Sequence, residues 1–302
     1  MRLQFLVDGI LTGAMIGLGA IGVTLTYSIL RFANFAQGEF IAWGAYFALC
    51  VATALGWLAG GASAPIGPFS FGWGLIVALF VAMPLTGSLA LGLDWALFAR
   101  LREKANSITL GIASFGASMA LRSLLEFLFT SRPVYFTREL QIAIRLGWGV
   151  RATPDQLALV GLTAILVIGL NLLLTRTQIG RSMRAVSENL NLARVAGVDV
   201  DRVVRVTWLL GGALACASGV MVGLVVQIRP FMGFDLLLPL FAAAILGGIG
   251  SVPGALVGGL IVGVAEAAAA ATVGAQWRAA VAFVLLIAML LVRPTGLFGA
   301  RQ

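Results

Sequence analysis

The chain has 302 residues, of which 60% are hydrophobic and only 11% are charged, whereas a soluble domain carries about 25% charged residues. This composition excludes a soluble globular protein and predicts an all-α polytopic membrane protein, because a transmembrane β-barrel would show alternating segments of about ten residues. The net charge of +8 does not indicate nucleic-acid binding, since the basic residues lie between the apolar segments, where the positive-inside bias places them.

Nine apolar segments follow one another along the chain, and about 20 apolar residues suffice to cross a hydrocarbon core roughly 30 Å thick. The segments cover approximately residues 5–30, 39–59, 73–98, 107–130, 155–175, 205–227, 236–250, 254–273 and 276–293. The first is too long for a signal-peptide core, so we expect it to be retained as a span. The seventh is short and interrupted by glycines, so eight and nine crossings are both compatible with the sequence. Residues 1–302 are predicted to form a single transmembrane domain.

The loops between these segments predict the orientation in the membrane. The basic loop 100–104 and the long loop 176–205 are separated by two segments, so both are predicted to be cytoplasmic. The same parity places the C-terminus inside and the N-terminus outside. It also places the loop 132–155 outside, against the charge bias. The arginines of that outer loop are Arg132, Arg138, Arg145 and Arg151.

Polar residues interrupt the apolar sequence between the first two segments. They are Asn34, Gln37, Gly38 and Glu39. Unwound backbone and polar side chains at membrane depth occur only next to a water-filled path or buried protein, and such interruptions are typical of substrate routes. We therefore predict a candidate translocation path here. The alternative is a plain turn between two spans, with Glu39 in the headgroup region.

Arg122, Glu126 and Glu266 are charged residues well inside predicted spans. Arg122 and Glu126 are four residues apart in the fourth segment, so they share a helical face and are predicted to neutralise each other. A structural ion pair is favoured over a proton relay, because a lone charge at the bilayer centre costs about 2.5–3.5 kcal/mol on insertion scales. Glu266, in a run of alanines, has no partner in the sequence, and a functional role and a cross-helix hydrogen bond are equally compatible with it.

The segment Arg176–Arg205 is the longest polar stretch of the chain. It holds six arginines and three acidic residues, and a short helix is predicted from Ser187 to Val195. Gly197 is predicted to end that helix in the left-handed conformation. A helix kept outside the lipid suggests a soluble docking partner, and an ordinary solvated loop is the alternative. The chain contains no G-x-x-x-x-G-K-[ST] motif, so any ATP that drives it binds to another polypeptide.

Glycines crowd the region from residue 247 to 263. Gly254 with Gly258, and Gly259 with Gly263, are spaced as small-x-x-x-small pairs that let helices approach closely. Tight packing is therefore favoured over direct contact with a substrate. The candidate hinge and packing residues at the break between the seventh and eighth segments are Gly247, Gly248, Gly250, Pro253 and Gly254.

No metal or redox site is predicted. The chain contains no histidine, which is the commonest metal ligand and general base. Its two cysteines, Cys50 and Cys216, lie far apart inside apolar segments and are predicted to be small packing residues.

Three stretches together resemble the integral-membrane permeases of branched-chain amino-acid ABC importers, the LivH/LivM family, and LivH more closely. They are Asn34–Phe40; Gly180–Ala185 with Ala196-Gly197 and Asp201-Arg202; and Leu246–Ala255, which continues through Glu266 to Arg293–Leu297. The likeness covers nearly the whole chain in the same order. Two residues depart from the family pattern, because Gln37 stands where the family usually has His and Pro239 stands where Lys is common. Both departures bear on the transported substrate, which is therefore not carried over.

The resemblance implies the ABC importer permease fold and a transport subunit that is not an enzyme. Its implied partners are a second copy of itself or a paralogous permease, two cytoplasmic ATP-binding subunits, a periplasmic substrate-binding protein and membrane lipid, with no nucleic acid. It implies no cofactor bound by this chain, since ATP belongs to the partner subunits. It also implies a multi-pass protein of the bacterial inner membrane that moves a branched-chain or hydrophobic amino acid, or a related small polar solute.

Two loops acquire roles from the same resemblance. The Arg176–Arg205 segment resembles the cytoplasmic coupling loop. Its implied contacts with the ATPase are Arg184, Glu188, Asn189, Ala193, Ala196 and Gly197. The outer loop 132–155, with its arginines, Tyr135 and Trp148, is predicted to steer the docking of an acidic binding protein, or else to be a solvated loop without a partner.

Two other function classes are compatible with the residues alone. An ion- or proton-coupled secondary transporter would use Glu39, Glu266 and the Arg122/Glu126 pair to carry the coupling ion. An internal repeat would favour that class, and the sequence shows no convincing one. A membrane enzyme that acts on lipid would need clustered acids or histidines near an interface, which the sequence lacks.

Overall fold

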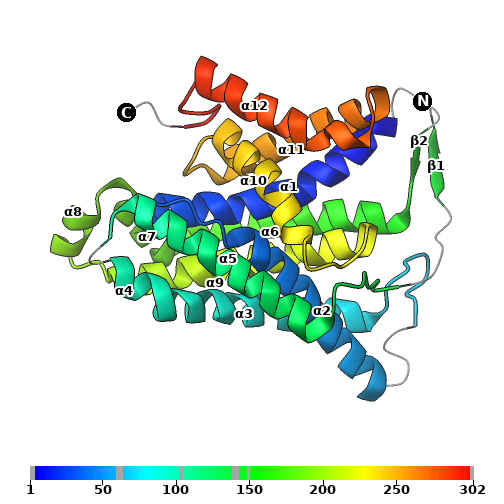
Figure 1. Ribbon diagram of the computed structural model, residues 1–302, viewed down its shortest axis with the longest axis horizontal. Coiled ribbons are helices and arrows are strands. Elements are labelled where there is room, and N and C mark those ends of the chain that lie inside the picture. The colour runs from blue at the N-terminus through cyan, green and yellow to red at the C-terminus, as the bar shows by residue number, and fades with distance from the viewer. Residues whose placement is uncertain (1–3, 59–63, 103–104, 138–142, 148–149, 300–302) are drawn as a thin grey trace.

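Figure 1 shows the computed structural model, which describes residues 4–58, 64–102, 105–137, 143–147 and 150–299. Most of these residues are helical. The helical elements are α1 (Gln4–Leu30), α2 (Gln37–Leu58), α3 (Trp73–Leu93), the π-helical turn η1 (Asp94–Phe98), α4 (Ala99–Arg102), α5 (Ser107–Phe129), α6 (Pro154–Arg176), α7 (Gln178–Glu188), α8 (Leu190–Val195), α9 (Val200–Val225), α10 (Met232–Gly247), α11 (Val252–Thr272), the 3-10 turn η2 (Ala275–Trp277) and α12 (Arg278–Val292). The prediction of a helical membrane bundle is confirmed.

Eight stretches of the described residues are helical, long and apolar enough to cross a membrane. They are α1, α2, the continuous helix from α3 to α4, α5, α6, α9, α11, and η2 with α12. Helix α10, the predicted seventh segment, has only 16 residues and is shorter than these. Helix α9 begins at Val200, earlier than predicted, because the Asp199 side chain caps it by accepting a hydrogen bond (3.0 Å) from the Arg202 N–H.

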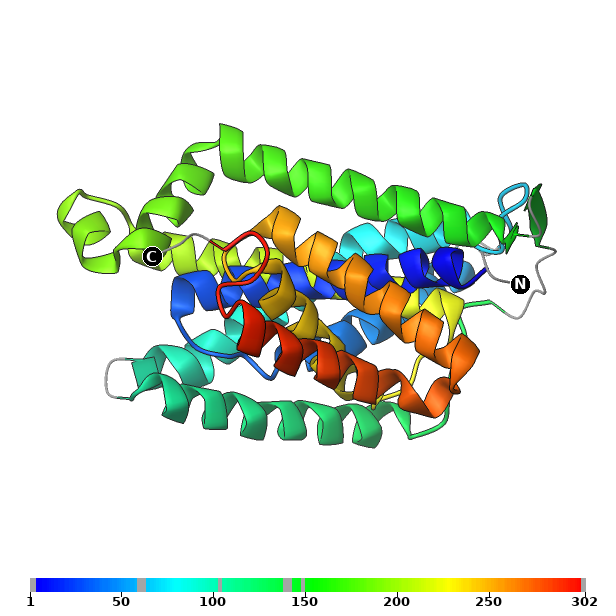
Figure 2. The same ribbon diagram turned by 90° about the horizontal axis from the view of Figure 1, so that it is seen from above.

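Loops predicted to lie on opposite sides of the membrane lie at opposite ends of the bundle. Helices α4, α7 and α8 and the last described residues lie at one end, which we call the coupling end, and the N-terminus lies at the other (Figures 1 and 2). That other end, the hairpin end, carries the antiparallel pair of β1 (Ile144–Gly147) and β2 (Val150–Ala152) from the predicted outer loop. The arrangement agrees with the orientation predicted from the loop charges.

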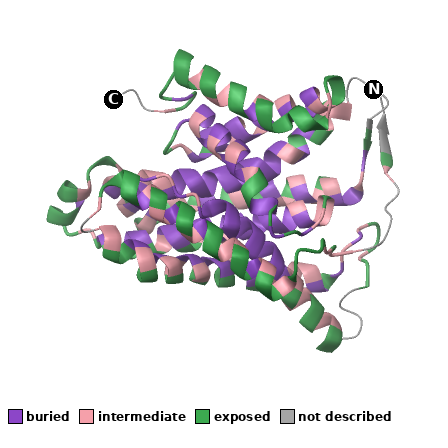
Figure 3. Ribbon diagram, in the orientation of Figure 1, coloured by how far each residue is buried: buried purple, intermediate pink, exposed green. Residues whose placement is uncertain are grey.

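Helices α1 and α9 form the centre of the bundle, whereas α6 and α12 lie at its periphery. In the most apolar 18-residue stretch of each span, the buried share is 72% in α1 and 67% in α9. The corresponding share is only 17% in α6 and 6% in the span formed by η2 and α12. Figure 3 shows the buried residues concentrated along the middle of the bundle. A helix that is apolar all round belongs in an interior, and the exposed apolar faces of α6 and α12 are suited to lipid.

Glycines let α1 and α11 pack backbone to backbone. A Cβ placed on Gly13 of α1 would lie 2.7 Å from the Cα of Leu260 and 2.8 Å from the Gly259 carbonyl oxygen. Gly263 of α11 faces Gly13 in the same way. This close approach agrees with the tight packing predicted for region 247–263. The sequence does not, however, identify α1 as the partner helix.

Candidate functional site

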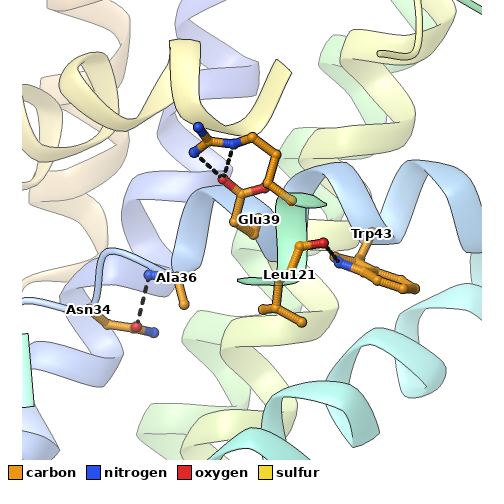
Figure 4. Close-up of polar contacts among 6 residues, drawn as sticks. Asn34, Ala36, Glu39, Trp43 and Leu121 are labelled. Atoms are coloured by element: carbon orange, nitrogen blue, oxygen red, sulfur yellow. Dashed lines mark hydrogen bonds and ion pairs between the residues drawn. The ribbon is translucent and has the colours of Figure 1, made fainter. Parts of the chain in front are cut away.

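The polar interruption after α1 is buried inside the bundle. Arg31 adopts the left-handed conformation with φ of 59°, which residues other than glycine seldom do. The Asn34 Oδ1 then accepts a hydrogen bond (3.1 Å) from the Ala36 N–H, which turns the chain into α2 (Figure 4). Asn34, Gln37 and Glu39 are at most 1% exposed, so all three lie inside the protein.

Glu39 forms an ion pair with Arg122 of α5. The Glu39 Oε1 accepts hydrogen bonds from the Arg122 Nε (3.2 Å) and Nη2 (2.7 Å), which join α2 to α5 (Figure 4). The predicted pairing of Arg122 with Glu126 is therefore wrong. The guanidinium reaches across to the neighbouring helix, where the fully buried carboxylate of Glu39 has the greater need of a counter-charge. Among the described residues, none forms an ion pair with Glu126.

Two further polar contacts fix α5 against the same segment. The Trp43 Nε1 donates a hydrogen bond to the Leu121 carbonyl oxygen (3.2 Å), next to the ion pair in sequence (Figure 4). The Ser114 Oγ accepts one from the Phe35 N–H (3.0 Å). These contacts hold α5, and with it the arginine, in a fixed position opposite Glu39.

Two phenylalanines at the start of α10 cover the Arg122 guanidinium. Its central carbon lies 4.3 Å from the centre of the Phe234 ring and 5.1 Å from that of Phe231. Such cation–π contacts stabilise by about 0.5–2 kcal/mol, more where water is excluded. The rings are 42% and 47% exposed, so this side of the ion pair faces the surface of the chain. The sequence does not single them out, because two phenylalanines in an apolar region are indistinguishable from lipid-facing residues.

The first turns of α2 and α10 meet beside the ion pair. A Cβ on Gly38 would collide with the Gly233 carbonyl oxygen, and a Cβ on Gly233 would collide with that of Gly38. The Gln37 Nε2 also donates a hydrogen bond to the Gly211 carbonyl oxygen of α9 (3.0 Å). Because helix N-termini carry partial positive charge, both helices favour a carboxylate at the position of Glu39. The glycine in the predicted path is thus explained by close backbone contact.

Three buried polar atoms of this segment lack a hydrogen-bond partner among the described residues. They are the Asn34 Nδ2, the Gln37 Oε1 and the Glu39 Oε2. A buried polar group without a partner costs about 1–3 kcal/mol, so native proteins keep few of them. All three lie within six consecutive residues, and the translocation path at this segment stays a prediction.

Two other singled-out residues do not contribute to this polar cluster. Glu266 is 5% exposed on α11, and within the described part of the chain no hydrogen bond or ion pair to its side chain is found. The cross-helix hydrogen bond considered for it is therefore not seen. Pro239 is buried inside α10, where its ring removes one backbone hydrogen bond of the helix.

The predicted coupling loop contains two short helices rather than one. Helix α7 begins after Thr177, whose Oγ1 accepts a hydrogen bond from the Gly180 N–H (3.2 Å). Helix α8 begins after Asn189, whose Oδ1 accepts one from the Leu192 N–H (3.0 Å). The predicted helix 187–195 is therefore interrupted at Asn189, because that side chain bonds to the backbone three residues later. Asn189 thus caps α8, and its contact with an ATPase subunit stays a prediction.

Gly197 ends α8 as predicted. Its φ of 81° is left-handed, and its N–H donates a hydrogen bond to the Arg194 carbonyl oxygen (3.0 Å). The next N–H, that of Val198, donates to the Ala193 carbonyl oxygen (3.0 Å). These two bonds form the Schellman pattern that closes a helix and turns the chain back.

Helix α8 lies at the coupling end (Figure 1) and exposes two large apolar side chains. Leu192 is 67% exposed and Val195 is 87% exposed, whereas Ala193 is buried. The predicted contact residues that are exposed are Arg184, Glu188, Asn189, Ala196 and Gly197. Ala193 is thus the exception among them, and Leu192 and Val195 are additions that the sequence motif did not indicate.

A side-chain contact joins the coupling loop to the end of α1. The Arg31 guanidinium donates a hydrogen bond to the Ser187 carbonyl oxygen, near the end of α7. A cavity of about 780 Å³ lies beside this contact, and its walls include Glu188, Ile249 and Phe298. The Arg31 side chain therefore connects the end of α1 to the end of α7.

The break between α10 and α11 is a turn with two left-handed glycines, Gly248 (φ 98°) and Gly250 (φ 96°). Ser251 caps α11 by accepting a hydrogen bond (3.1 Å) from a backbone N–H in the first turn. The last described residues brace the turn, because the Leu297 N–H donates a hydrogen bond to the Leu246 carbonyl oxygen (2.9 Å). Its hinge role stays a prediction.

Part of the predicted docking loop lies at the hairpin end. Arg132, Tyr135 and Arg151 are exposed there. The side chains of Arg138, Arg145 and Trp148 lie outside the described part of the chain. Docking of a binding protein at this loop therefore stays a prediction.

The sequence matches a protein family and several named relatives over almost its whole length. Residues 5–290 match the family described as branched-chain amino acid transport system, permease component. The chain is 34% identical over 302 residues to the high-affinity branched-chain amino acid transport system permease protein BraD of Pseudomonas aeruginosa, with 98% of this chain and 95% of that protein covered. It is 32% identical over 303 residues to the corresponding permease protein LivH of Escherichia coli K12, with the same coverage of 98% and 95%. It is 30% identical over 292 residues to a probable LivH of Methanocaldococcus jannaschii, covering 93% and 87% of the two chains.

Proposed function

We propose that this chain, which belongs to the family of branched-chain amino acid transport permeases, is the membrane subunit of an ATP-driven importer of branched-chain or similar hydrophobic amino acids. The observation that carries the proposal is the family match over residues 5–290, supported by relatives named as permeases that align with nearly the whole chain. The eight long apolar helices make it a multi-pass protein of the inner (plasma) membrane.

The energy for transport is assigned to other subunits. The sequence has no phosphate-binding loop of the G-x-x-x-x-G-K-[ST] type, so it supplies no such cradle for ATP. We assign ATP to two cytoplasmic subunits and solute capture to a periplasmic binding protein. This chain then contributes no covalent chemistry, and its work is to change which side of the membrane the path opens to.

The α7–α8 segment is proposed to connect the chain to an ATPase subunit. A short helix with exposed Leu192 and Val195 fits the apolar groove of a partner, while its charged neighbours contact the rim. The Schellman turn at Gly197 fixes the angle at which α8 projects from the bundle. Closure of two ATPase subunits would pull two such loops together and tilt the helices attached to them.

The translocation path is proposed to run along the side of α2 that faces α5 and α10. The Glu39–Arg122 pair lies there beneath half-exposed Phe231 and Phe234. Helix α5 presents large apolar side chains on the same face as Arg122, among them Met119, which lies three residues earlier and is 54% exposed. A second permease, either a copy or a paralogue, would cover this face and close the path between the two subunits.

The two other function classes do not fit as well. Relatives that share 30% or more of their residues over nearly the full length are named as transport permeases, which favours an importer subunit over a lipid-modifying enzyme. An ion-coupled transporter was predicted to use an Arg122/Glu126 pair. That pair does not form, since Arg122 bonds to Glu39 instead.

A pull-down in mild detergent tests the proposal. Tagged wild type is expected to retain an ATP-binding subunit, and Val195→Asp is expected to lose it about tenfold or more, because a charge enters the apolar surface of α8. Val273→Asp is the matched control, since Val273 is 62% exposed and follows α11 at the other end of the bundle. Wild type that purifies alone, with uptake abolished by a proton uncoupler, would overturn the proposal.

A further inference from the structure

We infer that the Glu39–Arg122 pair is a binding site for the charged groups of a zwitterionic apolar amino acid. Arg122 takes the solute carboxylate, Glu39 takes its ammonium group, and the rings of Phe231 and Phe234 lie against its side chain. The inference rests on the transport function proposed above and names the chemical class of solute that this site accepts.

Glu39 has unused capacity for a hydrogen-bond donor. Both bonds from Arg122 go to its Oε1, while its Oε2 is buried and has no partner among the described residues. An ionised carboxylate offers about four acceptor positions. A fully buried carboxylate oxygen without a donor is suited to an ammonium group that arrives with the solute.

Arg122 has unused capacity for an acceptor. It bonds to Glu39 through Nε and Nη2, and within the described residues its Nη1 donates no hydrogen bond. Its side chain is 12% exposed, and the two covering rings are nearly half exposed, so a solute moving along this face would reach it first. A guanidinium binds a carboxylate through two parallel hydrogen bonds.

The charge balance explains why the solute should be a zwitterion. Separating a buried ion pair is costly when either charge is left without a counter-charge. A solute with only one charge would neutralise one member of the pair and leave the other exposed to an apolar environment. A zwitterion brings both charges. Arg122 then binds the solute carboxylate in place of Glu39, and Glu39 binds the solute ammonium group in place of Arg122. Glu126, one helical turn from Arg122, adds a second carboxylate to this face of α5.

A purely structural role for the pair is the competing explanation. The pair does join α2 to α5, but the Trp43–Leu121 and Phe35–Ser114 hydrogen bonds join the same elements. The two explanations differ in one measurable property, because only a binding site makes the charge of the preferred solute depend on these two side chains.

Saturation-transfer NMR on the purified permease with its ATPase subunits measures that property. The probes are L-leucine, 3-methylbutylamine (leucine without its carboxylate) and 4-methylpentanoate (leucine without its amino group). Wild type is expected to bind leucine about tenfold more tightly than either singly charged probe. Glu39→Gln is expected to shift the preference toward 4-methylpentanoate, and Arg122→Gln toward 3-methylbutylamine.

Two further variants keep the test decisive. Glu39→Gln/Arg122→Gln retains hydrogen-bonding side chains without charge, so α2 and α5 stay joined while the preference for leucine falls to within about threefold. Arg102→Gln removes a different arginine, which pairs with Asp94 near the coupling end, and is expected to bind all three probes like wild type.

The inference is overturned if wild type binds the three probes equally, or if the single variants lower stability but keep the wild-type order of probes. Failure of the transport proposal is a separate result, because it would appear as wild type without an ATPase subunit. A complex that retains its ATPase and imports leucine, but whose probe preference ignores Glu39 and Arg122, would therefore refute only the site.

Discussion

The Asn34–Glu39 segment and the α7–α8 loop are both polar breaks in an apolar chain, but different contacts stabilise them. In the buried segment, Gln37 and Glu39 bond to residues 174 and 83 positions away. In the loop, the capping side chains bond to N–H groups only three residues later. Polar groups inside a membrane need protein partners because water is absent, whereas an exposed loop is stabilised by local bonds and by water.

The comparison predicts whether a substitution should change the stability of the bundle, its transport activity or both. A change in the buried segment removes contacts between helices, so both stability and transport should suffer. A change in the α7–α8 loop removes a local bond, so the bundle should stay folded while communication with the ATPase fails. The following substitutions test that separation.

Arg122→Ala is expected to have the largest effect, because it leaves the fully buried Glu39 without its counter-charge. The loss of stability should be about 3–5 kcal/mol, measured by thermal unfolding of the purified complex, with uptake into proteoliposomes abolished. Arg229→Ala is the control, since the Arg229–Asp235 pair is 48% and 51% exposed and should contribute less than about 1 kcal/mol. Equal losses in the two variants would contradict the contrast between buried and exposed charges.

Gly38→Val should have the next largest effect. Its branched side chain would collide with the backbone of Gly233 and push the first turns of α2 and α10 apart, at a cost of about 1–3 kcal/mol. Gly116→Val, on α5, meets open space and serves as the matched control. Uptake and the unfolding temperature should fall together in the first variant and stay near wild type in the second; uptake retained by Gly38→Val would show that the two helix ends need not touch.

Gly197→Ala should affect the loop alone. An alanine in the left-handed conformation costs roughly 1 kcal/mol, which loosens the end of α8 but removes no contact between spans. The unfolding temperature of the bundle should stay unchanged, while ATP hydrolysis stimulated by the loaded binding protein should fall several-fold. Gly161→Ala, in open space on α6, controls for the added methyl group. If Gly197→Ala lowered the unfolding temperature and Gly161→Ala did not, the loop would contribute to the stability of the bundle, which would contradict the proposed separation.

Arg31→Asn should have the smallest effect and tests the contact between the two regions. Asparagine tolerates the left-handed backbone of position 31 but is too short to replace the bond to Ser187. We expect unchanged stability and about twofold less solute transported per ATP hydrolysed, while Arg31→Lys keeps a donor and should preserve the ratio. A wild-type ratio for Arg31→Asn would mean that motion passes between the regions through other contacts.

The sequence predicted those features that depend on local chemistry. Apolar length located the spans, and Gly197 located the end of α8, because a left-handed residue closes a helix wherever the helix lies. Spacing along one helix paired Arg122 with Glu126, whereas the fold brings Glu39 to Arg122 from another helix. The covering phenylalanines were missed for the same reason. Contacts between distant segments depend on which helices become neighbours, and periodicity within one helix contains no such information.

The shortness of α10 constrains how the ribosome delivers this chain to the membrane. Its 16 residues rise about 24 Å, less than a hydrocarbon core roughly 30 Å thick, so α10 cannot partition into lipid as a finished span. Helix α11 follows after the turn 248–251 and packs against α10. We therefore expect the two helices to leave the translocon together as a hairpin. Synthesis would then have to continue through α11 before α10 enters the lipid, so the glycine turn between them would form before the two helices insert.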